Sequence, residues 1–161
     1  MTAQGNTRHI TPDPDTTLVL SRDFAADREL VFGALLNAKV LQTIWSVGPW
    51  TIVEIAVDPR VGGDWKLSMR HETTGEILRC KARYVEIQEP SRIVWRSKWL
   101  DGPLINADEM RITLDFTAIE GGTRLTVTHE LFPDRETRDD QGQRWASELR
   151  QLAGLLGDTF R

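Results

Sequence analysis

The stretch GGTRLTVTHELFPDRETRDDQGQRWASELRQL, residues 121–152, joins two patterns that together decide the fold. In its first part, 123–131, apolar and polar residues alternate, which is typical of a strand with one buried face. Phe132-Pro133-Asp134 then looks like a stop followed by a helix cap. Beyond it, apolar residues recur every three or four positions, which predicts one face of a long amphipathic helix, with Arg and Glu on the other face: Trp145, Leu149, Leu152, Leu156 and Phe160.

The chain upstream of this stretch reads as further strands and two short helices. Residues 27–45 have helical periodicity, which we expect to break at Asn37-Ala38. Turn signals separate the remaining segments at hairpin spacing, which favours antiparallel pairing. The predicted strands are 17–25, 50–58, 64–72, 76–88, 92–100, 108–119 and 123–131.

The apolar face of the C-terminal helix needs an apolar surface to cover, and the inner face of the sheet is the large one available. We therefore expect an α+β fold. In it, a curved antiparallel sheet of about six to seven strands wraps around the long C-terminal helix, and two short helices follow the first strand. Residues 1–15 are polar and contain two prolines, so we expect a flexible tail before a single domain over 16–161.

Composition excludes several classes of function. The formal net charge of −4 gives no electrostatic case for binding nucleic acid or an anionic membrane. The N-terminus lacks the apolar stretch of a signal peptide, and no run of about 18 apolar residues occurs. The single cysteine, Cys80, cannot form an internal disulfide. We therefore expect a cytoplasmic protein.

The glycine pair Gly62-Gly63 could be taken for a phosphate-binding loop, but its surroundings argue against this. A phosphate loop has Lys and Ser or Thr directly after its last glycine and leads into a helix, whereas Asp64-Trp65 and a strand follow here. We expect a turn that uses the positive-φ freedom of glycine. Histidine, cysteine and carboxylate residues occur at no recognised metal spacing, so we expect no metal and no cofactor.

Six tryptophans but only one tyrosine indicate a core with wide walls, or a cavity. Period two places two of the three histidines on inner strand faces, where each could be satisfied by neighbouring groups or could anchor a ligand. The tryptophans likewise could fill the core or line a pocket. The candidate ligand-binding residues are Trp65, Met69, His71, Trp95, Trp99, His129 and Trp145.

Three stretches carry a resemblance to a known family: RDFAADRELVFGALLNAKVLQTIW, VDPRVGGDWKLSM and the stretch quoted at the start. In order and spacing they resemble the START-like, or Bet v 1-like (SRPBCC), helix-grip superfamily, over about residues 17 to 157. Within it the chain is similar to the activator of heat shock protein 90 ATPase homologue-like family. It departs from the frequent pattern at Ile44, where a tryptophan is common, and at Gln141 and Arg144, where a histidine and a glycine are common.

The resemblance implies a hydrophobic cavity between the sheet and the C-terminal helix, and leaves three functions open. The first is non-catalytic binding of a small hydrophobic or aromatic molecule. The second is an aromatase, cyclase or hydrolase acting on polyketide-like substrates, with His71 or His129 as acid or base. The third is an interaction module, either a homodimer or a partner of a chaperone.

Overall fold

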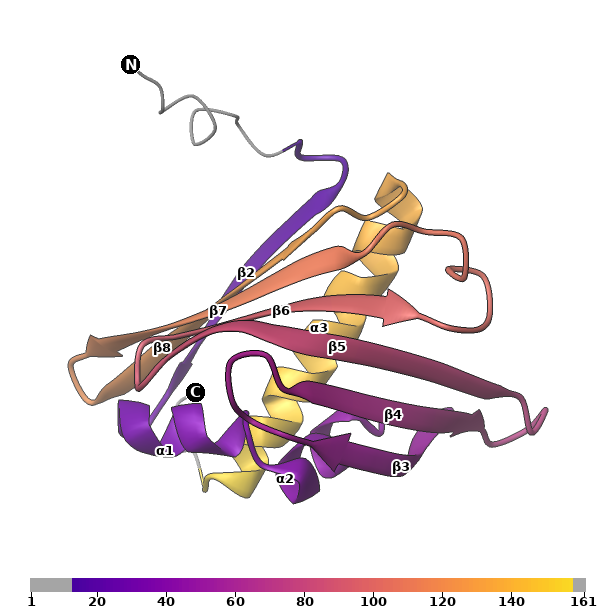
Figure 1. Ribbon diagram of the computed structural model, residues 1–161. Helices are drawn as coiled ribbons and strands as arrows, with labels where there is room; N and C mark the ends of the chain where they lie inside the picture. Colours follow the sequence, from indigo (N-terminus) through magenta and orange to yellow (C-terminus); the bar gives the residue numbers. More distant parts are fainter. Residues whose placement is uncertain (1–12, 158–161) are drawn as a thin grey trace, which may run out of the picture.

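The computed structural model describes residues 13–157, and these form one curved antiparallel sheet with three helices (Figure 1). The sheet has seven strands in the order β2-β8-β7-β6-β5-β4-β3, and every neighbouring pair is antiparallel. The elements are β2 (Thr17–Phe24), α1 (Arg28–Ala34), α2 (Ala38–Trp45), β3 (Trp50–Val57), β4 (Asp64–His71), β5 (Ile77–Gln88), β6 (Arg92–Trp99), β7 (Met110–Ile119), β8 (Gly122–Glu130) and α3 (Arg135–Leu155).

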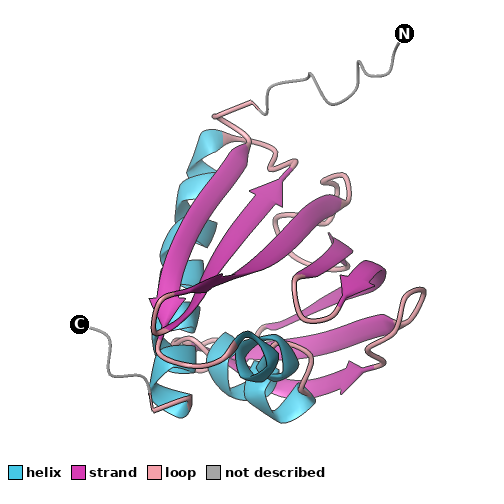
Figure 2. Ribbon diagram, turned by 90° about the vertical axis from the view of Figure 1, so that its left-hand side faces the viewer, coloured by secondary structure: helices cyan, strands magenta, loops and turns pink. Residues whose placement is uncertain are grey.

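The sheet curls around α3, which lies along its concave side in both views (Figures 1 and 2). The helices α1 and α2 follow β2 directly and lie at one end of this assembly (Figure 1). This arrangement confirms the predicted α+β helix-grip fold. The predicted strands match the observed ones to within two residues at each end.

The helix α3 begins where the sequence places a cap. Asp134 has an extended backbone, and its side chain accepts a hydrogen bond from the Thr137 N–H at 2.7 Å. This bond satisfies one of the free N–H groups of the first helical turn. The predicted apolar face is buried at Trp145, Leu149 and Leu152, whereas Phe160 lies outside the described residues. Within residues 13–157, no helix is both long and apolar enough to cross a bilayer.

The break between α1 and α2 has a local cause. The Asn37 side chain accepts a hydrogen bond from the Val40 N–H at 3.1 Å, which caps the start of α2. The buried residues of α2 are Leu41, Ile44 and Trp45, so this short helix sends a tryptophan toward the sheet.

Gly62-Gly63 forms the turn between β3 and β4, as predicted. Gly62 has φ +85°, and its N–H donates to the Tyr84 carbonyl oxygen at 2.8 Å. Gly63 is required by close packing, because a Cβ there would lie 2.3 Å from the Asp58 carbonyl oxygen. The turn is thereby bonded to β5, which fixes where β4 starts and which of its side chains face α3.

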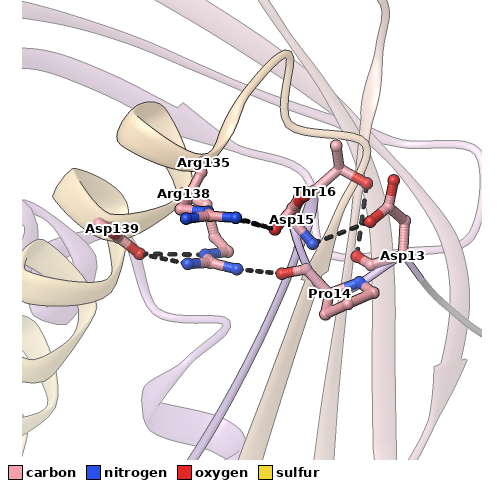
Figure 3. A network of polar contacts seen from close by, with 7 residues as sticks. All are labelled: Asp13, Pro14, Asp15, Thr16, Arg135, Arg138 and Asp139. Atoms are coloured by element: carbon pink, nitrogen blue, oxygen red, sulfur yellow. Dashed lines mark hydrogen bonds and ion pairs between the residues drawn. The ribbon is translucent and has the colours of Figure 1, made fainter.

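The residues before β2 contact the start of α3 (Figure 3). Arg135 bonds the Asp15 carboxylate at 3.0 Å, and Arg138 donates to the Pro14 carbonyl oxygen. Asp13 in turn accepts from the Asp15 N–H at 2.9 Å. Of the predicted tail over residues 1–15, residues 1–12 lie outside the described residues.

Candidate functional site

A cavity of about 80 Å³ lies between the sheet and α3. Its walls come from α2, from strands β3 to β8, and from α3, so it is assembled from most of the chain. Tryptophan is its most frequent lining residue. The lining residues are Trp45, Ile52, Trp65, Leu67, Met69, Cys80, Trp95, Ser97, Trp99, Ile112, His129, Gln141, Arg144, Trp145 and Glu148.

The size of this cavity limits what fits without movement. A cavity of roughly 150 Å³ admits benzene in a well-studied engineered case, and this one has about half that volume. Three indoles occupy much of the space between the layers. Ring centroids lie 5.1 Å apart for Trp45 and Trp65, and 5.9 Å apart for Trp65 and Trp95. The tryptophans therefore both fill the core and leave a small space between them.

The structure brings together all the predicted site residues except His71. The others line the cavity: Trp65, Met69, Trp95, Trp99, His129 and Trp145. His71 lies at the end of β4, where its Nδ1 accepts the N–H groups of Thr73 and Thr74 at 3.2 Å each. Its ring packs edge-on against Trp50 at 4.9 Å. His71 therefore stabilises the β4–β5 turn and is not a lining residue of the cavity.

His129 is buried among apolar side chains, and both of its ring nitrogens have side-chain neighbours. The Trp145 Nε1–H donates to His129 Nδ1 at 3.0 Å. Because an indole nitrogen only donates, Nδ1 must be the unprotonated nitrogen. The proton of the neutral ring is then on Nε2, which lies 3.3 Å from the Met110 sulfur. Burial lowers the pKa of His129 to about 3, so the imidazole is neutral at physiological pH.

Arg144 and Glu148 on α3 form a hydrogen-bonded pair at the cavity that no sequence pattern indicated. Arg144 donates from Nε to Glu148 Oε2 at 3.1 Å and from Nη2 to the Trp45 carbonyl oxygen at 3.0 Å. Nη2 also lies 3.5 Å from the Met69 sulfur. Arg144 therefore links α3 to α2 and β4 at the edge of the cavity.

Glu148 corrects the prediction that the glutamates of α3 occupy its solvent-facing side. Its side chain is only 7% exposed, against 20% for Arg144. Burial raises the pKa of Glu148 to about 8, although the neighbouring Arg144 favours the charged form.

The sequence did carry one signal that pointed to this part of the cavity. Gln141 and Arg144 are positions where the chain departs from the family pattern, and both line the cavity.

One buried donor of the cavity lining, the Trp65 Nε1–H, has no hydrogen-bond partner among the described residues. The Tyr84 hydroxyl is also buried without a partner, but Tyr84 is not a lining residue. Buried polar groups of this kind are costly unless a water or ligand satisfies them. Over residues 13–157, no three His, Cys, Asp or Glu side chains converge on a point where they could hold a metal ion.

The sheet, the long helix it wraps and the cavity between them define a protein of the START-like helix-grip superfamily. More narrowly, the chain belongs to the family described as activator of Hsp90 ATPase homolog 1-like protein, whose sequence model matches residues 25–157. No curated protein matches the chain.

Solved structures with the same fold come from several organisms. A protein of Chromobacterium violaceum is 25% identical, with a TM-score of 0.79 over 87% of this chain and 96% of that one. A protein of Rhodobacter sphaeroides is 22% identical, with a TM-score of 0.76 over 91% of this chain and 96% of that one. An HSP90 activator of Plasmodium falciparum is 21% identical, with a TM-score of 0.65 over 89% of this chain and 97% of that one.

Proposed function

We propose that this protein binds a small hydrophobic or aromatic molecule in the cavity between the sheet and α3, without catalysing a reaction. The observation that carries the proposal is the composition of the lining, in which five tryptophans surround a few polar groups. Ligand sites are characteristically apolar and aromatic, with a small number of polar groups that orient the ligand. The buried, unpartnered Trp65 Nε1–H supports the proposal further, because a ligand acceptor would satisfy it.

Entry of an aromatic ligand requires a side chain to move, because the cavity is smaller than a benzene site. Trp99 is the candidate. It is the last residue of β6 and is half-buried, whereas the other four lining tryptophans are buried. We infer that rotation of Trp99 enlarges the cavity, and that the remaining tryptophans form its fixed walls.

The enzyme alternative gave the acid–base role to His71 or His129, and neither histidine fits that role. General acid–base catalysis needs a nitrogen that can reach the substrate and a pKa near the working pH. The Nδ1 lone pair of His129 is used by Trp145, and its pKa is far below neutrality. His71, the other histidine considered, does not line the cavity.

Binding is tested by blocking the cavity while keeping the fold. Ser97 lines the cavity and is buried, so Ser97→Leu fills the space with apolar atoms. The matched control is Ser68→Leu, since Ser68 lies on β4 between the inward-facing Leu67 and Met69. A panel of lipids and aromatic compounds is screened by tryptophan fluorescence and by shift of the melting temperature.

We expect compounds that stabilise the wild type and Ser68→Leu but leave Ser97→Leu unchanged. A panel with no effect on the wild type would refute the proposal. So would hits that persist in full in Ser97→Leu, because binding would then lie elsewhere.

A chaperone-directed role is the second candidate, and the family match favours it. The structural likeness to the Plasmodium falciparum HSP90 activator points the same way, although at 21% identity it shows the fold alone. The test is the ATPase rate of a purified Hsp90-type chaperone with and without this protein. An unchanged rate, with no complex by light scattering, would remove this candidate.

A further inference from the structure

We propose that the ligand of this cavity carries a carboxylate, which Arg144 binds, while its compact apolar part contacts the tryptophan walls. This inference rests on the proposed function and names the chemical class of its ligand. It comes from the balance of hydrogen-bond donors, acceptors and charges around the cavity, none of which the family assignment specifies.

Two acceptors at the cavity are already used, while one of its lining residues has a spare donor. The His129 Nδ1 acceptor is occupied by Trp145, and Glu148 Oε2 is occupied by Arg144. On the donor side, the Trp65 Nε1–H has no partner among the described residues. The His129 Nε2–H meets only a sulfur, which is a weak acceptor. A ligand rich in acceptors therefore complements this site better than one rich in donors.

Arg144 is placed to receive that acceptor group. Its guanidinium has five N–H donors, and its contacts within the protein are made through Nε and Nη2. It is also more exposed than Glu148, which lies one helical turn further along α3, so it is the more accessible member of the pair. A planar guanidinium fork matches a carboxylate, with which it forms paired, charge-assisted hydrogen bonds.

The other titratable groups that line the cavity do not oppose an anion. Cys80 on β5 is a neutral thiol, because burial raises its pKa to about 12, and His129 on β8 is a neutral imidazole. Glu148 is the only acid that lines the cavity within the described residues, and burial favours its neutral form near neutral pH. A protonated Glu148 would itself donate a hydrogen bond to a ligand carboxylate.

The same features argue for a monoanion. Arg144 is the only cationic side chain among the lining residues that the structure describes, and the cavity measures about 80 Å³. A dianionic phosphate ester would bring a second charge with no second cation to receive it. Because the rest of the lining offers no further cation, we expect the rest of the ligand to be uncharged.

The experiment compares three probes of nearly equal shape and different charge: benzoate, benzamide and benzamidinium. Isobutyrate and isobutyramide repeat the comparison with a smaller group. Dissociation constants are measured at pH 7 by titration calorimetry on the full chain. We expect each carboxylate to bind at least tenfold more tightly than its amide, and benzamidinium to bind most weakly.

Two variants locate the effect. In the double variant Arg144→Met/Glu148→Leu both partners are replaced by apolar residues of similar size, a change that buried ion pairs often tolerate. We expect it to fold, to bind benzamide still, and to lose the preference for benzoate. Glu148→Gln keeps a donor beside Arg144, so we expect its preference for benzoate to persist.

The outcomes separate this inference from the proposed function. If benzamide or benzamidinium binds the wild type as tightly as benzoate, the carboxylate assignment is wrong while ligand binding stands. The same conclusion follows if only uncharged compounds of the broader panel bind, or if the double variant keeps the preference. If neither these probes nor the panel bind, the proposed function itself fails.

Discussion

The Trp145 indole donates a hydrogen bond to His129 Nδ1 at 3.0 Å, and this bond joins α3 to strand β8 through two buried side chains. Each residue satisfies the polar group of the other in surroundings that offer little water. His129 also stacks on Phe132, with ring centroids 4.2 Å apart. The pair thus fixes the tautomer of the histidine and the position of the helix above the cavity.

Removing the indole N–H from this pair should destabilise the fold. In Trp145→Phe the Nδ1 acceptor is left buried without a partner, which typically costs about 1–3 kcal/mol beyond the loss of packing. The control is Trp50→Phe, because Trp50 is half-buried and meets His71 only through ring packing. Urea unfolding should show the larger loss for Trp145→Phe. Equal losses would mean that the hydrogen bond adds nothing.

The pKa of Glu148 predicts that stability falls as pH rises above neutrality. The folded state raises this pKa from 4.5 to about 8, so it binds the proton more tightly than the unfolded chain does. The stability that this gives is complete below pH 4.5 and is lost as pH rises through 8. Between pH 6.5 and 8 the wild type should lose about 2 kcal/mol, at 1.36 kcal/mol per pH unit. Glu148→Gln should show no such loss over this range.

The titration of His129 changes the stability of the fold in the opposite direction, and at lower pH. Its pKa falls from 6.5 to about 3 on folding, so its contribution is complete above pH 6.5 and is lost as pH falls toward 3. Between pH 5 and 6.5 the slopes from His129 and Glu148 cancel in the wild type. In Glu148→Gln the histidine acts alone, and stability should rise by about 2 kcal/mol from pH 5 to 6.5. In His129→Phe it should fall by a similar amount. Parallel curves for the wild type and both variants, from urea unfolding at each pH, would contradict both assignments.

The fold was predictable from the sequence because each element carries its own periodic signal. Strand β4 alternates cleanly, and α3 repeats its apolar residues at helical spacing. Short polar turns separate the strands, so their hairpin order follows from their spacing. These are local properties, and the long helix has only one apolar surface of suitable size to cover.

The candidate site was only partly predictable, because parity gives the face of a side chain but not its depth or its position along the strand. His71 and Met69 share a face of β4, yet His71 lies at the strand end and bonds to the turn. Helical periodicity has a similar limit at Glu148, which the pattern places on the polar side of α3 but which the structure buries. It directly precedes Leu149 on α3 and lies at the border of the apolar face, so its burial depends on the curvature of the sheet around it. That curvature arises from the whole assembly, and no single pattern encodes it.

The Gly62-Gly63 turn should tolerate substitution poorly at its second position. A Cβ at Gly63 would lie 2.3 Å from the Asp58 carbonyl oxygen, so the backbone must move. We expect Gly63→Ala to cost about 1–3 kcal/mol or more, as forced packing does.

Gly154→Ala is the control, because nothing lies within 4 Å of a Cβ at that position of α3. There alanine should stabilise the helix by about 0.5–1 kcal/mol. Thermal unfolding should show shifts of opposite sign.

On the outer face of the sheet, three lysines stand in one cross-strand row. Lys81 on β5 is in register with Lys66 on β4 and with Lys98 on β6. Like charges directly opposite each other destabilise a sheet, and an opposite-charge pair contributes roughly 0.2–1 kcal/mol.

We therefore expect Lys81→Glu to raise the free energy of unfolding by about 1 kcal/mol at low salt. Lys81→Gln, which removes the repulsion without adding attraction, should give about half of that gain. Since Lys66 and Lys81 are exposed, 1 M salt should reduce both gains. Urea unfolding at two salt concentrations measures this directly, and a Glu variant no more stable than the Gln variant would show that the row does not act through charge.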